Sequence, residues 1–580
     1  MKQFYKKFHL FTLSLFVSFL LSSCQEKKSV APLLSFTNPL DLSYRFMLNE
    51  EPSCREAADP TVVLYKGTYY LFASKTGGYW YSDDLADWTL VLTDQIPTEE
   101  YAPTAIVMRD TLFFMASNKK PNTIYKSADP KSGIWSVAKQ HIDTDVWDPC
   151  LFRDDDGKLY LYWGCSNKDP LYGVELDTLT FDFIGEPRAL IYPQQKLLGW
   201  EIRGDYNTQK EESPWIEGAW MNKINGVYHL QYASPGTREK SYCDAVYKSE
   251  NPLGPFELAK HNPFAYKPEG FVCGAGHGST FSDKYGNLWH IGTSVIAVNH
   301  KFERRLVLYP TFVDENGELY SWTRLGDYPQ LIPDKKIESP QRPEQQWMLL
   351  SYRKPVSVSS TLPGFDPANM TDENIRTHWS ASSDSSSEWA MIDLQDQLMV
   401  HAIQINFAEQ DAHLQGRSEN HPHQFLIECS SDKKEWSKVA DRTNATSDNT
   451  HPYIVMDSPV STRYIRIQNI RVPDGCFAIS GMRIFGKGNG EAPAAVQHFT
   501  ALRNKSDLRE VYLSWNKQEK AVGYNIRYGE QENLLHHNYQ VYGDTTLTIR
   551  SLNAENKYYF AIEAFNENGV GKLSAPIQMQ

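Results

Sequence analysis

The chain has 580 residues, with 58 Lys and Arg against 71 Asp and Glu, a net charge of −13 and 13% aromatic residues. At about 150 residues per domain, this length predicts three or four domains. The acidic balance argues against nucleic-acid binding, which depends on clustered Lys and Arg. The aromatic content and the short apolar runs exclude a disordered chain and a membrane transporter. The cysteines include no C-x-x-C pair, so neither a zinc site nor a dense disulfide framework is expected.

Residues 1–23 have the order of a secretory signal, with three lysines before an apolar run from Leu10 to Leu21. The run is too short to span a bilayer comfortably. It ends in Leu-Ser-Ser-Cys, which resembles a bacterial lipobox, whose Cys becomes the acylated N-terminus. The sequence therefore predicts lipidation at Cys24, a tether over residues 24–35 and a protein anchored in the bacterial cell envelope, at the outer membrane facing the periplasm or the cell surface. An ordinary secretory signal with an incidental Cys is the alternative.

Five segments then share one outline: a polar or small start, a short strand, a tight turn, and an aromatic-rich strand that ends in small residues. They begin at Asp59, Ala102, Asp148, Glu217 and His277. Most of the turns carry the Gly that a hairpin needs for positive φ. Five hairpins without helical periodicity between them favour a radial array of four-stranded blades over a sandwich. The sequence therefore predicts an all-β fold with a five-bladed β-propeller over residues 36–335.

Acidic residues open three of these hairpins. Asp59 lies eight residues before its turn Gly, and Asp148, Glu217 and His277 lie nine residues before theirs. Equivalent positions of successive blades converge on one central funnel, so we expect these side chains to meet. Hydrolysis of a glycosidic bond needs an acid and a carboxylate, and a third carboxylate raises the pKa of the acid. Asp-Pro and Glu-Gly also occur at strand starts for structural reasons, but three acids in one register favour a site.

The hairpins DPTVVLYKGTYYLFAS, WDPCLFRDDDGKLYLYWG and EGAWMNKINGVYHLQYAS resemble glycoside hydrolase family 43, the inverting five-bladed propeller enzymes. The resemblance implies that Asp59 is the general base, that Asp148 raises the pKa of the acid and orients it, and that Glu217 is the general acid. His277 matches an axial histidine that holds a calcium ion or its waters at the funnel centre. A structural Ca²⁺ is therefore expected there, with a hydrogen-bonded core His as the alternative, and the chemistry requires no cofactor.

Six further residues are candidates for substrate binding on weaker grounds: Tyr101, Trp147, Glu201, Arg203, Trp215 and Arg305. The two Trp flank acidic positions, and Tyr101 stands where the family more often has Trp. Glu201 and Arg203 lie in a long connection, and long loops often shape the mouth of a site. Arg305 carries donors for a sugar hydroxyl. A plain surface or ion-pair role is the alternative for the charged residues.

Two modules follow the predicted propeller. Residues 346–487 alternate polar and apolar positions, which indicates a β-sandwich. Segments such as ANMTDENIRTHWSAS and RYIRIQNI resemble the discoidin-like, coagulation-factor type C fold, whose relatives include carbohydrate-binding modules. Sugar binding and a purely structural role both stay open, and Trp379 and Trp389 are expected in the core. Residues 495–580 resemble fibronectin type III, with Tyr558 spaced for a tyrosine corner, and are expected to act as a spacer or packing domain.

These observations favour a lipid-anchored, exo-acting glycosidase of the α-L-arabinofuranosidase type that trims side chains of plant polysaccharides. A β-xylosidase, galactofuranosidase, exo-galactanase or arabinanase of the same family is the alternative. From a different class, a surface lipoprotein that binds glycans without catalysis is the rival hypothesis. The expected partners are a polysaccharide or oligosaccharide and, through the lipid anchor, a membrane, but no nucleic acid.

Overall fold

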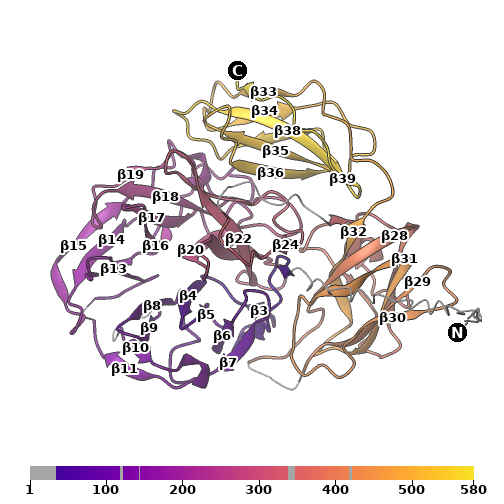
Figure 1. Ribbon diagram of the computed structural model, residues 1–580, viewed down its shortest axis with the longest axis horizontal. Coiled ribbons are helices and arrows are strands. Elements are labelled where there is room, and N and C mark those ends of the chain that lie inside the picture. The colour runs from indigo at the N-terminus through magenta and orange to yellow at the C-terminus, as the bar shows by residue number, and fades with distance from the viewer. Residues whose placement is uncertain (1–33, 118–121, 143, 338–346, 417–420) are drawn as a thin grey trace, which may run out of the picture. The chain divides into compact units, whose positions relative to one another are not determined.

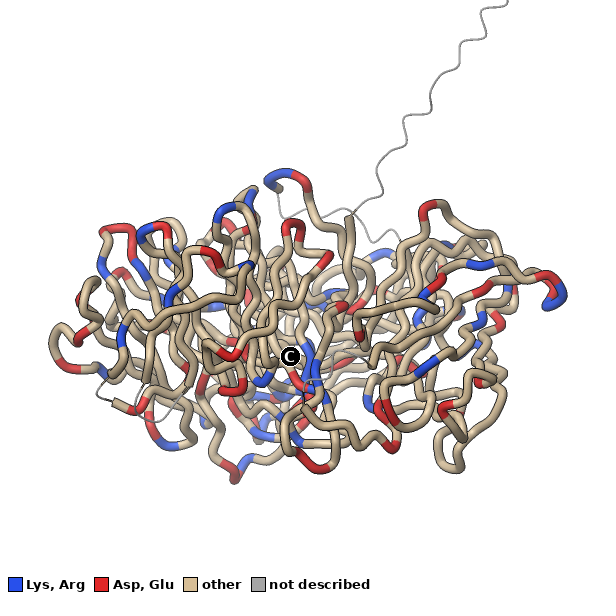
Figure 2. Tube along the Cα trace, turned by 90° about the horizontal axis from the view of Figure 1, so that it is seen from below, with Lys and Arg blue, Asp and Glu red and all other residues tan. Residues whose placement is uncertain are grey.

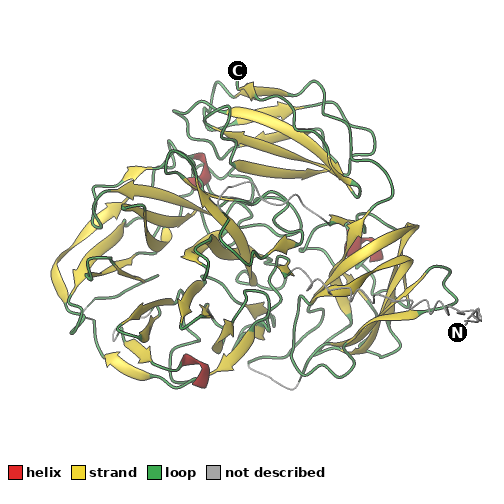
Figure 3. Ribbon diagram, viewed as in Figure 1, coloured by secondary structure: helices red, strands yellow, loops and turns green. Residues whose placement is uncertain are grey.

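The computed structural model describes residues 34–117, 122–142, 144–337, 347–416 and 421–580. Within these ranges the secondary structure is almost entirely β, and the helices are short 3₁₀ turns at Pro130–Ser132, Gly199–Glu201 and Pro367–Thr371 (Figure 3). The expected signal peptide and Cys24 lie outside the described residues. Across the same ranges, no helix combines the length and the apolar character that crossing a membrane requires.

Five sheets of four antiparallel strands follow one another along the chain, each in simple chain order. The first contains β4 (Thr61–Tyr65), β5 (Thr68–Phe72), β6 (Gly78–Ser82) and β7 (Thr89–Leu92). The second contains β8 (Thr104–Met108), β9 (Thr111–Met115), β10 (Ile124–Ser127) and β11 (Ser136–Lys139). The third contains β12 (Cys150–Arg153), β13 (Leu159–Trp163), β14 (Leu171–Leu176) and β15 (Phe183–Ile191). The fourth contains β16 (Glu217–Ile224), β17 (Val227–Ser234), β18 (Cys243–Ser249) and β19 (Glu257–Leu258), and the fifth β20 (Gly276–Ser282), β21 (Leu288–Val295), β22 (Arg304–Val313) and β23 (Leu319–Ser321).

The first strands of these sheets form a closed ring. β4 contacts β8, β8 contacts β12, β12 contacts β16, β16 contacts β20, and β20 returns to β4. Figure 1 shows the sheets arranged radially around this ring. The five-bladed propeller that the repeats predict is therefore confirmed, and the start of every blade faces the same central funnel.

Turn chemistry explains the hairpins and their unequal lengths. The two-residue turns at Lys66-Gly67 and Asn225-Gly226 have positive φ at both positions, as type I′ turns require. The third and fifth blades have longer turns, in which the N–H groups of Gly157 and Gly286 donate to the carbonyl groups of Asp154 and Asp283. These longer turns add one residue between the strand start and the turn Gly.

The N-terminal segment closes the propeller between its first and last blades. β1 (Ser35–Phe36) pairs with β24 (Gln330–Leu331), and β2 (Arg45–Phe46) pairs with β3 (Arg55–Glu56). The side chains of Phe36, Leu40 and Tyr44 share one buried cluster with residues of the first and fifth blades. Burial of this apolar surface holds the two ends of the ring together.

The second module (residues 347–487) is built on two strands of 19 residues, β28 (Trp389–Phe407) and β31 (Tyr453–Arg471), which pair with each other. A register shift between Asp393 and Leu398 interrupts this pairing. The remaining strands complete the sheet: β25 (Met348–Leu349), β26 (Val356–Val358), β27 (Trp379–Ser380), β29 (Gln424–Ser430), β30 (Ser437–Asp441) and β32 (Ala478–Lys487). Trp379 is buried as expected, whereas Trp389 is half-buried.

The third module (residues 495–580) consists of two sheets. One contains β33 (Thr500–Arg503), β34 (Val511–Ser514) and β37 (Thr546–Ile549). The other contains β35 (Gly523–Gly529), β36 (His537–Tyr542), β38 (Tyr559–Asn566), β39 (Gly569–Val570) and β40 (Ile577–Gln578). The N–H of Asn553 donates to the hydroxyl oxygen of Tyr558 at 3.1 Å, the contact of a tyrosine corner.

Both modules pack against the propeller. Trp515 and Tyr528 of the third module belong to the same buried cluster as Tyr162 and Trp200 of the propeller. The second module contributes Glu409, which forms an ion pair with Arg55 of the propeller at 2.7 Å. Residues 34–580 accordingly form one compact unit, over whose trace Lys and Arg are interspersed with Asp and Glu (Figure 2).

Candidate active site

The backbone at the start of each blade has an unusual conformation. Asp59, Ala102, Asp148, Gly218 and His277 have φ of 53°, 48°, 52°, 60° and 46°, in the left-handed region. Non-glycine residues rarely adopt such φ values, and their recurrence marks these five positions as structural equivalents. The equivalent of Asp59 in the fourth blade is therefore Gly218 rather than Glu217. The sequence register was one residue off there, because the nine-residue spacing belongs only to blades with the longer turn.

The carboxylate of Asp59 is buried and held by three groups. Its Oδ2 accepts a hydrogen bond from the Ser74 hydroxyl at 2.6 Å. Its Oδ1 lies 3.2 Å from Nη1 of Arg304 and 3.3 Å from Nδ1 of His277. The backbone N–H of Asp59 donates to Oγ1 of Thr293 in the last blade, at 2.9 Å. These contacts fix the carboxylate at the closing point of the ring.

Asp148 faces the same ring nitrogen of His277 as Asp59 does. Its Oδ2 is 3.8 Å from Nδ1 of His277, and its N–H donates to the Ser117 hydroxyl at 2.7 Å. Burial raises the pKa of Asp148, His277 opposes that shift, Glu217 and Asp59 add to it, and the pKa comes to about 6. The pKa of Asp148 therefore depends on the charges of Glu217 and Asp59.

Glu217 is adjacent to Asp148, and each places a carboxylate oxygen within 4.8 Å of the other and of Sγ of Cys165. The Tyr242 hydroxyl donates to Oε1 of Glu217 at 2.6 Å, and the Cys165 thiol donates to Oε2 at 3.2 Å. Burial and the neighbouring acids raise the pKa values of Tyr242 and Cys165 above their usual ranges. Both groups therefore keep their protons near neutral pH and hold Glu217 in place as donors.

His277 stands among the acids, and a further carboxylate supports its backbone. The N–H groups of His277 and Gly278 donate to the two oxygens of Asp244 at 2.7 and 2.8 Å. Burial lowers the pKa of His277, but the surrounding carboxylates outweigh burial and raise it above the ordinary value. A Cβ atom added to Gly218 would lie 2.6 Å from the His277 ring, so only Gly fits beside it.

Three family models match successive parts of the chain. Residues 54–318 match the model of glycosyl hydrolases family 43, residues 355–480 the F5/8 type C domain and residues 494–580 the fibronectin type III domain. The chain carries a family 43 glycosyl hydrolase domain. The two modules that follow are thereby identified as discoidin-like and fibronectin type III domains.

Curated relatives match part of the chain. One is the "Beta-xylosidase" of Xylanibacter ruminicola, 29% identical over 165 residues, which cover 24% of this chain and 45% of the relative. Another is the "Xylan 1,3-beta-xylosidase" of a Vibrio species, 25% identical over 270 residues, which cover 40% of this chain and 46% of the relative. The chain therefore spans less than half the length of these relatives. A solved "xylan beta-1,4-xylosidase from Bacillus Halodurans C-125" has 14% identity and a TM-score of 0.41 over 94% of this chain and 96% of its own, which supports no conclusion about this chain.

Within the family 43 domain, the structure brings Asp59, Asp148, Glu217 and His277 together as expected, although Glu217 lies one residue before the repeat position. Their catalytic roles stay predictions. Arg305, by contrast, has its Nε 2.9 Å from Nε2 of His451 in the discoidin-like module. Neighbouring residues of a strand face opposite sides. Arg304 therefore faces Asp59, whereas Arg305, which was expected to bind a sugar hydroxyl, faces the discoidin-like module.

The other candidates for substrate binding lie in different environments. Glu201 is fully buried and accepts a hydrogen bond from the Tyr232 hydroxyl at 2.7 Å, so it belongs to the core of the fourth blade rather than to a loop at the mouth. Nε of Arg203 forms an ion pair with Glu239 at 2.7 Å. Arg203 therefore has the ion-pair role that was the alternative to substrate binding.

The aromatic candidates flank the acids. Tyr101 precedes the start of the second blade and lies 5.8 Å from the Arg304 guanidinium, beside Asp59. Trp147 directly precedes Asp148 and is 40% exposed, so its ring is available to a ligand. Trp215 is half-buried, and its backbone N–H donates to the carbonyl of Pro235. Binding of a sugar by these three side chains stays a prediction.

The donors around His277 do not fit a directly bound calcium ion. Calcium requires six to eight oxygen ligands, whereas the oxygens of Asp59, Glu217 and Asp244 already accept hydrogen bonds or ion pairs from protein groups. The Arg304 cation beside Asp59 further disfavours a second cation. The calcium expected from the resemblance stays a prediction that metal analysis of the purified protein tests.

Several residues of the site escaped the sequence analysis. Ser74 and Ser117 were detectable, because each follows Ala at the end of the second strand in its repeat. Arg304 directly precedes Arg305, the residue that the sequence had indicated as a candidate for sugar binding. Tyr242 and Asp244 carry no such signal, since the third strand of the fourth blade was not part of the aligned outline.

Proposed function

We propose that this chain is an exo-acting, inverting glycoside hydrolase of plant-polysaccharide side chains. The observation that carries the proposal is the convergence of Asp59, Asp148 and Glu217 at the centre of a family 43 propeller. Three buried carboxylates around one histidine are costly to assemble, and such clusters concentrate at functional sites.

In the proposed mechanism, Asp59 removes a proton from a water molecule that attacks the anomeric carbon. Glu217 gives its proton to the leaving oxygen in the same step. Arg304 and Ser74 hold Asp59 in the orientation that this attack requires, and Tyr242 and Cys165 hold Glu217. Asp148 places a carboxylate next to Glu217, which favours retention of the acid's proton until the substrate takes it.

For the substrate, we propose a terminal pentose, with α-L-arabinofuranosides tested first and β-xylosides beside them. Names of relatives support this class: "Beta-xylosidase" for the Xylanibacter ruminicola protein and "Xylosidase/arabinosidase" for a Butyrivibrio fibrisolvens protein that is 27% identical over 211 residues. A relative named "Beta-D-galactofuranosidase xynD", from Aspergillus niger, keeps galactofuranosides among the substrates to test.

The test is product analysis with aryl α-L-arabinofuranoside, β-xylopyranoside and β-galactofuranoside, followed by arabinan and arabinoxylan. We expect release of one monosaccharide, and proton NMR in the first minutes should show the anomer opposite to that of the substrate. A first product of retained configuration would refute the single-displacement mechanism. Binding of polysaccharide without release of any sugar would instead support the glycan-binding lipoprotein.

We also propose that Cys24 carries a lipid that anchors the protein in the cell envelope. The support is the sequence of residues 1–24 alone. Replacing Cys24 by Ser should remove lipid labelling and shift the protein from the membrane fraction to the soluble fraction, because acyl chains supply the membrane affinity. Membrane association that survives this substitution would contradict the proposal.

A further inference from the structure

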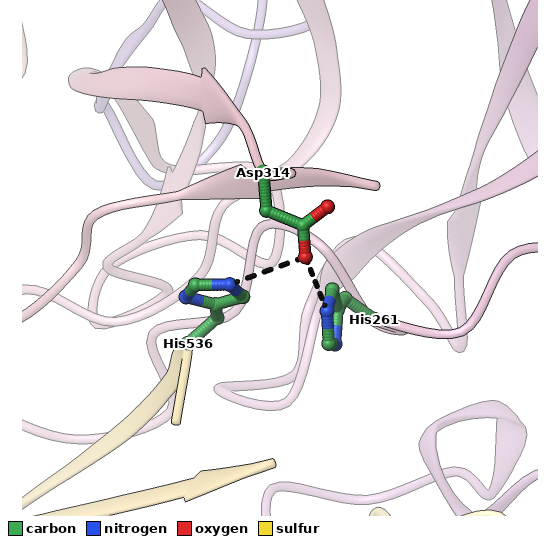
Figure 4. A group of neighbouring side chains, drawn as sticks. All are labelled: His261, Asp314 and His536. Carbon is green, nitrogen blue, oxygen red and sulfur yellow. Dashed lines mark hydrogen bonds and ion pairs between the residues drawn. The ribbon is translucent and has the colours of Figure 1, made fainter. Parts of the chain in front are cut away.

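A second cluster of chemically active side chains lies away from the catalytic funnel. Figure 4 shows His261, Asp314 and His536 pointing toward one another. His261 follows β19, and Asp314 begins the turn between β22 and β23 of the last blade. His536 directly precedes β36 of the fibronectin type III domain. Two domains therefore contribute to one cluster.

The distances within this cluster suit a small metal ion. Oδ2 of Asp314 lies 2.9 Å from Nε2 of His261 and 3.4 Å from Nε2 of His536, and all three atoms lie within 4.8 Å of one another. Ligands held about 2.0–2.2 Å from a tetrahedral zinc ion are roughly 3.3–3.5 Å apart. The His536–Asp314 distance already has this spacing, whereas His261 must move away from Asp314 and exchange its hydrogen bond for the ion.

Two ring nitrogens of the cluster, Nε2 of His536 and Nδ1 of His261, lack a hydrogen bond to any described atom. Nε2 of His536 is buried and makes no hydrogen bond to any described atom, although it lies within ion-pair distance of Asp314. The exposed fractions of the side chains of His261, Asp314 and His536 are 1%, 3% and 12%. Buried polar nitrogens are almost always satisfied, so an unpaired nitrogen that faces a carboxylate indicates a missing partner.

The surroundings hold the three ligands in place. Oδ1 of Asp314 accepts the N–H groups of Asn316 and Glu318 at 2.8 and 2.9 Å, which leaves Oδ2 to face the histidines. The ring of His536 stacks on Tyr320, with centroids 3.7 Å apart and an interplanar angle of 6°. Such supporting contacts orient metal ligands before the ion binds.

We propose that His261, Asp314 and His536 bind a zinc ion, with water at the fourth position, and that this ion links the propeller to the fibronectin type III domain. Two imidazole nitrogens and one carboxylate oxygen are ligands that zinc accepts. Calcium and magnesium prefer oxygen ligands alone, so two histidines disfavour them. The ion lies outside the catalytic funnel and joins two domains, because its ligands come from an outer turn of a blade and from the fibronectin type III domain.

Zinc binding by the full chain tests the proposal. After removal of metals with a chelator, the wild-type protein is titrated with zinc by calorimetry, and its metal content is measured after dialysis. His536→Phe keeps the ring on Tyr320 but removes the nitrogen, and Asp314→Asn keeps an oxygen and the size of the side chain. His537→Phe is the matched control, because the His537 ring packs edge-on against His261 with centroids 6.4 Å apart but is not one of the three proposed ligands.

We expect the wild type and His537→Phe to bind one equivalent of zinc that His536→Phe and Asp314→Asn lose, with affinity lower by at least about 100-fold. Zinc should also raise the thermal midpoint of the wild type but not that of the two cluster variants, because a ligand that binds only the folded state stabilises it. Cobalt(II) should give the visible spectrum of a tetrahedral ion in the wild type and in His537→Phe but not in the two cluster variants. Equal zinc affinity in the wild type and His536→Phe, or no zinc binding by the wild type, would overturn the proposal.

Discussion

At the scale of single residues, the site depends on donors that hold the carboxylates. Glu217 lies between the Tyr242 hydroxyl and the Cys165 thiol, and Asp59 between Ser74 and Arg304. Both carboxylates are thus oriented by neutral donors or a cation. Substitution of an acid by its amide keeps the size of the side chain, but the amide NH2 cannot accept, so one of these hydrogen bonds is lost or reversed. Measurement of the stability of each amide variant therefore accompanies its kinetics.

Glu217→Gln should reduce kcat/KM on natural oligosaccharides by about 10²–10⁴-fold, the usual contribution of a general acid. Aryl glycosides with good leaving groups should lose far less, because such groups depart without a proton. Steady-state kinetics on both substrate types measures the difference. Equal losses on the two would argue that Glu217 is not the acid.

Gly218→Ala should disturb His277, because the new Cβ would lie 2.6 Å from its ring and the backbone has φ +60°. We expect kcat/KM to fall at least about tenfold, which corresponds to about 1.4 kcal/mol of transition-state stabilisation. Gly226→Ala is the matched control, since its φ is +84° but the added Cβ meets no atom within 4 Å. The control should lose only about 1–2 kcal/mol of stability and keep its activity. Similar activity losses in both variants would contradict a specific role of Gly218.

At the scale of single elements, the short helix Gly199–Glu201 places a carboxylate in the core of the fourth blade. Glu201 accepts hydrogen bonds from the Tyr232 hydroxyl and the Gln194 N–H, yet it has no cationic partner among its described contacts. Burial raises its pKa to about 7. Burial of this carboxylate therefore makes the free energy of unfolding depend on pH, which a carboxylate on an exposed turn would not do.

The raised pKa of Glu201 fixes the direction of this pH dependence. The folded state binds the proton of Glu201 more tightly than the unfolded state, so the free energy of unfolding falls as pH rises from about 4.5 to 7. The full difference is about 3 kcal/mol, as an order of magnitude. Glu201→Gln should make stability less dependent on pH over this window, which urea denaturation at pH 5 and pH 8 measures. An unchanged pH dependence in the variant would exclude Glu201 as its source.

At the scale of the whole molecule, buried ion pairs join the propeller to the discoidin-like module. Arg55 pairs with Glu409 at 2.7 Å and with Asp448 at 2.6 Å, and all three side chains are buried. Burial raises the pKa of Asp448, but Arg55 and His423 outweigh burial and hold it at about 2. Since charges in this interface compensate one another, the two domains should unfold together.

Arg55→Met should therefore destabilise the protein by about 3–5 kcal/mol, because it leaves two buried carboxylates without their shared cation. Lys438→Met, which removes the exposed partner of Asp441, should change stability by less than about 1 kcal/mol. Calorimetry of the wild type should show one transition for residues 34–580. Two well-separated transitions would contradict the coupling of the domains.

The sequence alone determined the repeated hairpins, the five blades and the three acids that open them. These features follow from local rules, because alternation along a strand and glycines at turns act over a few residues. Tertiary structure decided the rest. Gly218 rather than Glu217 is the equivalent of Asp59 because turn lengths differ between blades, and Arg304 rather than Arg305 faces Asp59 because adjacent strand residues point to opposite sides. The meeting of His536 with Asp314 joins residues more than 200 positions apart, and such proximity arises only when separate domains pack together.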